Sequence, residues 1–291
     1  MTDDRLAADT AMGAVTLRVG DLDAMTAYYR DAVALQVMDA TGDTVTLGRG
    51  GTPIVVLTHA PELVRASPHE AGLFHTAILF DSEEALAASV YSVAQKYPAT
   101  FTGSADHLVS KAFYFTDPEG NGVELYWDRN RSTWSWVHGT VEMSTLSLDP
   151  NAFLLDNLTE ASVADPVIGA ARVGHVHLQV GDVDTAREFY VERLGFAQTA
   201  MLGPQSLFVS AGGYHHHMAM NTWNSGGAGP RLPALGLAQV QIEVPAADDL
   251  GALVERVTHF GIQSRDDGSS VSFDDPWGSQ ITVGVKTDQQ R

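Results

Sequence analysis

The sequence contains no cysteine. Disulfide bonds, thiolate metal sites and cysteine nucleophiles are therefore excluded together. It also has no apolar run that approaches the ~18 residues of a membrane span, and its start, MTDDRLAADT, is acidic where a signal peptide would be basic. We therefore expect a soluble cytoplasmic protein.

Positive charge is scarce. Lys and Arg number 17 against 36 Asp and Glu, which gives a formal net charge of −19. Such a surface repels phosphate backbones and anionic lipids, so neither nucleic acid nor a membrane is expected as a partner. The remaining composition, 44% hydrophobic and 18% charged, is globular, and 291 residues suffice for two domains of roughly 150 residues.

The chain repeats itself. Residues 15–35 and 176–196 both read as an alternating strand, a Gly-Asp turn and an amphipathic helix. In each turn the aspartate, Asp21 or Asp182, is well placed to cap the helix. The identical pairs are Val15/Val176, Leu17/Leu178, Val19/Val180, Gly20/Gly181, Asp21/Asp182, Asp23/Asp184 and Tyr29/Tyr190.

A fainter repeat relates residues 74–90 to residues 238–254, and a DPxG turn follows each, at 117–120 and 275–278. Proline presets the dihedral of such a turn, and glycine accepts its positive φ. The pattern predicts an α+β chain of four βαβββ units that start near residues 13, 73, 173 and 237. We expect the first pair of units in 1–129, a linker over 130–172 and the second pair in 173–291.

Histidines gather on strand positions of these units. His175, His177 and Gln179 share one face of a strand whose other face is apolar, so they point away from the helices. His75 occupies the position equivalent to His175, and Glu124 lies between apolar neighbours on a final strand. A single strand histidine is most often a satisfied core residue. Two with a buried carboxylate suit an Fe(II) oxygenase site, although zinc also binds such a set.

These features resemble the vicinal oxygen chelate superfamily, which includes glyoxalase I and the type I extradiol dioxygenases. The greatest likeness is to catechol 2,3-dioxygenases of the CatE type. Their signature of His, an apolar residue, Tyr, Asp-Pro-x-Gly and Glu reads here as His107, Phe113, Tyr114, 117–120 and Glu124. Ala105, two residues before His107, departs from that pattern. The segment SAGGYHHHMAMNTW (210–223) resembles the paired-histidine strand of the family, with a polar loop as the alternative interpretation.

The resemblance implies a fold of two curled-sheet half-barrels and a role for each matching residue. His75, Glu124 and His175 would bind Fe(II), or alternatively Mn(II). His217 would be the acid/base histidine, with His215 on the same face. Tyr114 would hydrogen-bond the substrate oxygen, and His107 would line the pocket.

One departure from the family predicts how the units pair. The best-known extradiol dioxygenases take their ligands from units three and four, but unit four here has Gln239 and Thr282 at those positions, and unit one has Ala14. Only units two and three together supply both histidines and the carboxylate. We therefore expect unit three to lie against unit two and unit one against unit four. The alternative is a site completed across a dimer interface.

The predicted function is extradiol cleavage of a catechol or substituted catechol by O₂ at a non-haem Fe(II) site. The expected partners are this small aromatic diol, O₂ and further copies of the chain in a homo-oligomer. Two alternatives stay open at this point. One is another metal-dependent enzyme of the superfamily, an isomerase, epimerase or lyase, and the other is a non-catalytic protein that binds a small aromatic ligand.

Overall fold

The computed structural model describes residues 5–200 and 202–286, so the outermost ends of the two predicted domains, 1–4 and 287–291, lie outside the described residues. Each half of the chain forms two strand-helix-strand units. The first unit contains β1 (Ala11–Val19), α1 (Leu22–Ala27), a π-helical turn (Tyr28–Ala32), β2 (Gln36–Thr41), β3 (Thr44–Arg49) and β4 (Thr52–His59). The second contains β5 (Gly72–Phe80), α2 (Glu83–Lys96), a 3₁₀ turn (Pro98–Thr100), β6 (Phe101–Asp106), β7 (Ser110–Thr116) and β8 (Gly122–Asp128).

The second half repeats this order. The third unit contains β12 (Ala171–Gln179), α5 (Val183–Arg187), a π-helical turn (Glu188–Arg193), β13 (Ala197–Ala200), β14 (Ser206–Ser210) and β15 (Met218–Asn221). The fourth contains β16 (Gly236–Val244), α6 (Ala247–His259), β17 (Ser264–Asp266), β18 (Ser270–Asp274) and β19 (Gln280–Val285).

The segment between the halves carries short elements of its own. They are a 3₁₀ turn (Arg131–Thr133), β9 (Trp136–Val137), β10 (Thr140–Val141), β11 (Leu146–Ser147), α3 (Pro150–Asn157) and α4 (Glu160–Ala164). The strands β9 and β10 form a separate hairpin, and β11 adds an edge strand beside β6. Helices α3 and α4 pack against α2.

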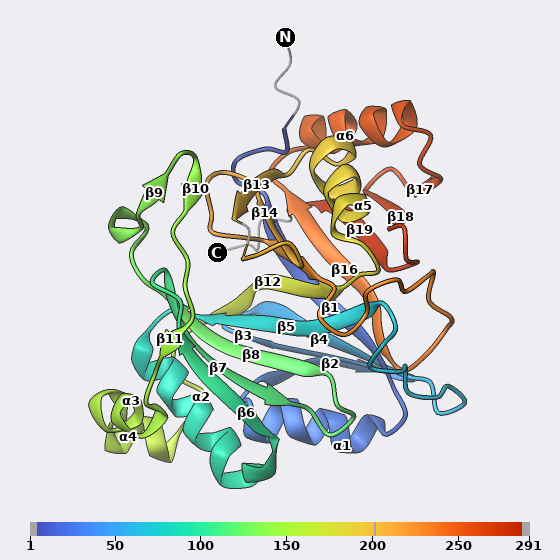
Figure 1. Cartoon of the computed structure of the whole chain (residues 1–291). Coiled ribbons are helices and arrows are strands. Elements are labelled where there is room, and N and C mark those ends of the chain that lie inside the picture. Colours follow the sequence, from blue (N-terminus) through green and yellow to red (C-terminus); the bar gives the residue numbers. More distant parts are fainter. Residues whose placement is uncertain (1–4, 201, 287–291) are drawn as a thin grey trace.

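Two sheets contain almost all the strands, and each takes one unit from each half of the chain. One sheet has the order β11-β6-β7-β8-β5-β12-β15-β14-β13, and the other has the order β17-β18-β19-β16-β1-β4-β3-β2. The antiparallel pairs β5–β12 and β1–β16 join the halves. In Figure 1 the strands fill the middle, with α1 to α4 below them and α5 and α6 above. The predicted α+β class and the pairing of unit two with three and one with four are confirmed.

The local signals read from the repeats act as expected. The side chain of Asp21 accepts a hydrogen bond from the Ala24 N–H at 2.9 Å, and that of Asp182 accepts one from the Thr185 N–H at 2.7 Å. Both aspartates therefore cap the helices that follow them. The glycines of the two DPxG turns have φ of +88° at Gly120 and +78° at Gly278, the left-handed region that glycine enters without strain.

A tyrosine-aspartate hydrogen bond ties the units together in each half. The Tyr29 hydroxyl donates to Oδ2 of Asp117 at 3.1 Å, and the Tyr190 hydroxyl donates to Oδ2 of Asp275 at 3.1 Å. Both tyrosines lie in the π-helical turns, and all four side chains are buried. The repeat therefore preserves a buried contact between the first helix of each half and the DPxG turn of the next unit.

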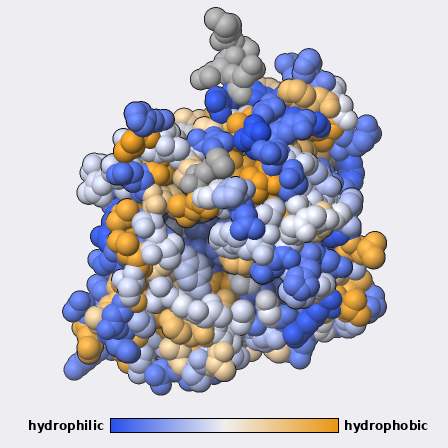
Figure 2. Space-filling view, viewed as in Figure 1, coloured by the Kyte–Doolittle hydropathy of each residue, from blue (hydrophilic) through white to orange (hydrophobic). Residues whose placement is uncertain are grey.

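Among the described residues, no helix combines the length and the apolar character that crossing a membrane requires. Hydrophilic residues predominate on the face seen in Figure 2, and apolar residues lie there in scattered patches. This agrees with the strong excess of acidic side chains in the sequence.

Candidate metal centre

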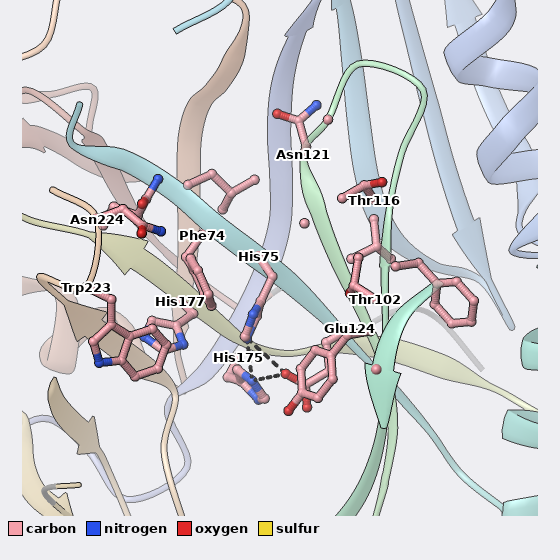
Figure 3. Close-up of a pocket in the computed structure, with 18 of the residues that line it drawn as sticks. Phe74, His75, Thr102, Thr116, Asn121, Glu124, His175, His177, Trp223 and Asn224 are labelled. Atoms are coloured by element: carbon pink, nitrogen blue, oxygen red, sulfur yellow. Dashed lines mark hydrogen bonds and ion pairs between the residues drawn. The ribbon is translucent and has the colours of Figure 1, made fainter. Parts of the chain in front are cut away.

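A cavity of about 710 Å³ opens over the sheet that units two and three form. Its floor carries His75, Glu124 and His175 (Figure 3). In the same view Phe74, His177 and Trp223 lie on one side of the floor, and Thr102 and Thr116 lie on the other. The labelled side chains on the first side are aromatic, and those on the other side carry hydroxyl groups.

The three floor residues converge on one point. Nε2 of His75 lies 2.9 Å from Oε2 of Glu124, Nε2 of His175 lies 3.1 Å from the same oxygen, and the two Nε2 atoms are 3.4 Å apart. All three residues are buried, and each offers one ligand atom within 4.8 Å of the others. They come from β5, β8 and β12 of a single chain. The arrangement needs no partner subunit, which removes the alternative of a site shared across a dimer interface.

The protonation state of these groups suits a cation. Burial on its own would raise the pKa of Glu124, but the imidazoles of His175 and His75 hold it well below its ordinary value. Burial lowers the pKa of His175 to about 4, despite the opposing effect of Glu124. An ionised carboxylate and a neutral imidazole are the forms that ligate metals. Two imidazoles and one carboxylate with no thiolate match the 2-His-1-carboxylate set typical of non-haem Fe(II).

Strand alternation places these side chains. Val176, Leu178 and Val180 are buried in the main core, whereas His175, His177 and Gln179 line the cavity. The two faces that the sequence predicts for this strand are therefore confirmed. On β8, Val123 and Leu125 join the core in the same way while Glu124 faces the cavity.

His107 and Tyr114 form a hydrogen-bonded chain at the cavity wall. Nδ1 of His107 lies 2.7 Å from the carbonyl oxygen of Ser144, and its Nε2 lies 2.6 Å from the Tyr114 hydroxyl. Because a carbonyl only accepts, Nδ1 carries the hydrogen, and Nε2 is left to accept from Tyr114. Burial, and then the charge of Glu124, raises the pKa of Tyr114 well above its ordinary value. The phenol is thus neutral and keeps its lone pairs free for a further donor.

The three consecutive histidines do not lie in a strand. Residues 211–217 connect β14 to β15, which begins only at Met218. The expectation of one strand through this segment is therefore wrong, because Gly212 and Gly213 have φ of +61° and +66°, outside the extended region. The polar-loop alternative describes the connection better, although His215, His216 and His217 are all buried in it.

These three histidines have different surroundings. His216 lines the cavity, and its ring centroid lies 4.1 Å from that of His175. His217 does not line the cavity. Its Nδ1 accepts from the Ala211 N–H at 3.2 Å, and burial lowers its pKa to about 3. Burial lowers the pKa of His216 well below its ordinary value too. The acid/base role for His217 stays a prediction.

His215 joins His216 to a carboxylate. Nε2 of His215 lies 2.9 Å from Oδ1 of Asp128, and its Nδ1 lies 2.8 Å from Nδ1 of His216. If Asp128 accepts from His215, then His215 accepts from His216, whose Nε2 is left without a hydrogen. Tyr214 donates to the other oxygen of Asp128 at 2.7 Å and fixes the carboxylate. Sequence reasoning missed Asp128 because it lies 87 residues from its partner His215, and no sequence motif links the two residues.

His177 is a fourth buried histidine beside the floor. The backbone N–H of Trp223 donates to Oδ1 of Asn221 at 3.1 Å. The side-chain NH₂ of Asn221 therefore faces Nε2 of His177, at 2.9 Å. His177 therefore accepts through Nε2 and carries its hydrogen on Nδ1. Burial lowers the pKa of this imidazole well below its ordinary value. The strand pattern had placed His177 on the cavity face but had given it no role.

Comparison with known proteins agrees with this geometry. Residues 11–125 and 172–283 match the Glyoxalase/Bleomycin resistance protein/Dioxygenase superfamily. The chain belongs to this superfamily. A protein of Bacillus subtilis (strain 168) named catechol-2,3-dioxygenase is 32% identical to it over 283 residues, which cover 95% of this chain and 98% of that protein.

Two solved structures show the same fold at low identity. The cppA protein of Streptococcus pneumoniae matches with a TM-score of 0.60 and 9% identity, over 97% of this chain and 99% of that one. Glyoxalase I of Zea mays matches with a TM-score of 0.55 and 17% identity, over 95% of this chain and 92% of that one. These likenesses establish the architecture of the superfamily for this chain.

Proposed function

We propose that this protein is an extradiol dioxygenase, which uses O₂ to open the ring of a catechol or substituted catechol beside its paired hydroxyls. The observation that carries the proposal is the convergence of His75, Glu124 and His175 at the floor of a cavity with an aromatic wall. The full-length similarity to a catechol-2,3-dioxygenase supports it. Fe(II) is the cation that best fits this ligand set, with Mn(II) as the alternative.

An ion held by His75, Glu124 and His175 would supply Lewis acidity that eases deprotonation of the catechol, and it would bind the diol and O₂. The residues around it do the rest. Tyr114 has its hydrogen committed to His107, so its oxygen accepts a hydrogen bond from a substrate hydroxyl. This contact orients the ring above the floor.

His216 is the residue that holds a proton in this scheme. The chain from Asp128 through His215 keeps the hydrogen of His216 on Nδ1, so its Nε2 receives a proton from the substrate and later returns it. The neighbouring aromatic side chains exclude water from the reacting ring. Here Asp128 and His215 act as positioning residues, since neither lines the cavity.

The test is anaerobic reconstitution with Fe(II), addition of catechol and then admission of air. We expect one bound iron per chain and a yellow ring-opened product near neutral pH. Bound iron without turnover across a panel of catechols would contradict the proposal and favour another metal-dependent reaction of the superfamily. Binding of catechol that persists unchanged after removal of the metal would instead indicate a non-catalytic binding protein.

A further inference from the structure

The segment that joins the two halves of the chain also reaches the cavity. Met143 and Thr145 of this segment line it. Between them, the carbonyl oxygen of Ser144 accepts the hydrogen bond from Nδ1 of His107 at 2.7 Å. Strand β10 of the same segment packs against β13 of the third unit (Figure 1). Part of the segment is therefore a wall of the site as well as a connection between the halves.

A small hydrophobic cluster, separate from the main core, lies between this segment and the third unit. Its buried members come from the second unit, the segment and the third unit: Val109, Trp134, Val141, Ala200, Phe208, Tyr214 and Ala219. Trp134 is the largest of them and is 8% exposed. Its indole N–H donates to the carbonyl oxygen of Arg129 at 3.1 Å, which fixes the ring within the segment. The cluster therefore fastens the segment to the part of the chain that carries the three consecutive histidines.

Trp134 packs on both side chains that bind the Asp128 carboxylate. Its ring centroid lies 5.2 Å from that of His215, edge to face, and 5.8 Å from that of Tyr214. The guanidinium of Arg131 lies over both aromatic rings, 5.7 Å from the centroid of Trp134 and 5.0 Å from that of Tyr214. Ring contacts and cation–π contacts of this kind favour one arrangement of the side chains. His215 and Tyr214 each hydrogen-bond one oxygen of Asp128, so this packing holds all three groups together.

We propose that Trp134 is a positioning residue of the reaction, because it holds the His215 ring in contact with Asp128. With His215 fixed in this way, the hydrogen of His216 stays on Nδ1 and its Nε2 stays without one. A row of imidazoles keeps one set of tautomers only where packing holds each ring in one rotamer. The inference rests on the proposed function, in which His216 receives a proton from the substrate. Trp134 does not line the cavity, so its effect reaches the substrate only through His215 and His216.

The decisive comparison uses two tryptophans that are two residues apart. W134L removes the ring that contacts His215, and W136L is the matched control, because Trp136 lies in the β9–β10 hairpin and is 41% exposed. In the Fe(II)-loaded protein we expect W134L to lower kcat for catechol by about 10- to 100-fold, with KM and iron content unchanged. W136L should match the wild type, and W134F, which keeps an aromatic ring, should recover most of the loss. Equal kcat in W134L and W136L, or loss of iron from W134L, would overturn the proposal.

The tautomers are measured separately, by ¹⁵N NMR of the histidine rings in the metal-free, full-length protein, so the inference does not depend on turnover. In the wild type and W136L we expect His215 to carry its hydrogen on Nε2 and His216 on Nδ1. In W134L both rings should show a mixture of tautomers. If this difference is found but the wild type cleaves no catechol, the positioning role holds and the proposed dioxygenase function fails. Identical tautomers in W134L and W136L would overturn the positioning role, even where kcat falls.

A second variant covers the case in which W134L does not fold. W134M keeps much of the apolar bulk of the side chain without its ring, and a methionine side chain adapts to irregular spaces. We expect W134M to fold, as checked by circular dichroism, and to show the same fall in kcat and the same mixture of tautomers as W134L. Wild-type kcat together with wild-type tautomers in W134M would show that the ring does not position His215 and would overturn the proposal.

Discussion

The two sheets share one architecture and differ in chemistry. In the sheet of units two and three, Glu124 on β8 pairs with Tyr114 on β7 and with Ala77 on β5. In the sheet of units one and four the equivalent positions are Thr282 on β19, Ser272 on β18 and Gln241 on β16. Carboxylate and phenol are thus replaced by two hydroxyls, and the Ser272 and Thr282 hydroxyls hydrogen-bond each other at 2.8 Å.

The second sheet is also closely packed at Gln241. A Cβ atom on Gly13 would lie 2.7 Å from the Gln241 side chain, so the amide chain packs directly on the backbone of β1. The connections differ as well. Strands β3 and β4 are joined by Gly50 and Gly51 alone, whereas residues 211–217 join β14 to β15 and carry three histidines. One βαβββ frame therefore carries a candidate metal centre in one sheet and hydroxyl side chains in the other, according to a few side chains.

Removal of the ligands should have the largest effect. We expect H75A, E124A and H175A each to lower the affinity for Fe(II) by more than the 10- to 100-fold that loss of a ligand's supporting hydrogen bond costs, and to abolish turnover. Q239A and T282A, at the equivalent positions of the other sheet, should leave both unchanged. Metal analysis after dialysis and the catechol assay measure this difference. Loss of iron from T282A would contradict the view that only the sheet of units two and three holds the metal.

His216 should come next. We expect H216Q to lower kcat for catechol by about 10²- to 10⁴-fold, the usual contribution of a general acid/base, while the iron content stays the same. H217Q is the matched control, because His217 bonds to the connection and does not line the cavity. A larger loss of kcat in H217Q than in H216Q would support the acid/base role that the sequence predicts for His217.

Asp117 should make stability depend on pH. Burial raises its pKa to about 6, against an ordinary value of 3.8. Between these values the folded state keeps a proton that the unfolded state has lost, so stability falls as pH rises and the loss is complete above pH 6. A difference of about two pKa units corresponds to a loss of about 3 kcal/mol in the free energy of unfolding.

The measurement is urea unfolding of the metal-free protein at several pH values from 3.8, through 6, up to neutrality. Relative to wild type, D117N should gain about 3 kcal/mol in its free energy of unfolding from low pH to pH 7. D275N should shift in the same direction, because burial raises the pKa of Asp275 too. A constant difference between wild type and D117N across this range would refute the assignment.

The smallest effect should be the same in both halves of the chain. Y29F and Y190F each remove one buried hydrogen bond to a DPxG aspartate, and we expect each to lower the free energy of unfolding by about 1 kcal/mol. Catechol turnover should not change in either variant. Markedly unequal losses in the free energy of unfolding, measured with denaturant, would mean that the two contacts are not equivalent, although both hydrogen bonds measure 3.1 Å.

Much of the fold could be predicted because its signals are local and repeated. Alternation placed His175 and His177 opposite Val176, and the Gly-Asp and DPxG turns marked where each unit begins and ends. The pairing of the units followed from chemistry: Gln239 and Thr282 cannot replace a histidine and a carboxylate, so the ligand set was complete only if units two and three met.

The relay behind His216 could not be predicted in the same way. Two glycines with positive φ turn the chain before His215, and no periodicity then tells which of three adjacent imidazoles faces the cavity. The contact of His215 with Asp128 joins the β14–β15 connection to the end of β8, which is remote from it in sequence. Such contacts depend on tertiary packing, which spacing alone does not encode.

His75 and Glu124 precede the segment 130–172, and His175 follows it. An ion bound by all three therefore crosslinks the two halves of the polypeptide. The unfolded chain offers no such preformed site, so the affinity for the ion adds to the stability of the folded state. Metal loading would therefore strengthen a union of the halves that the β5–β12 and β1–β16 pairings already provide.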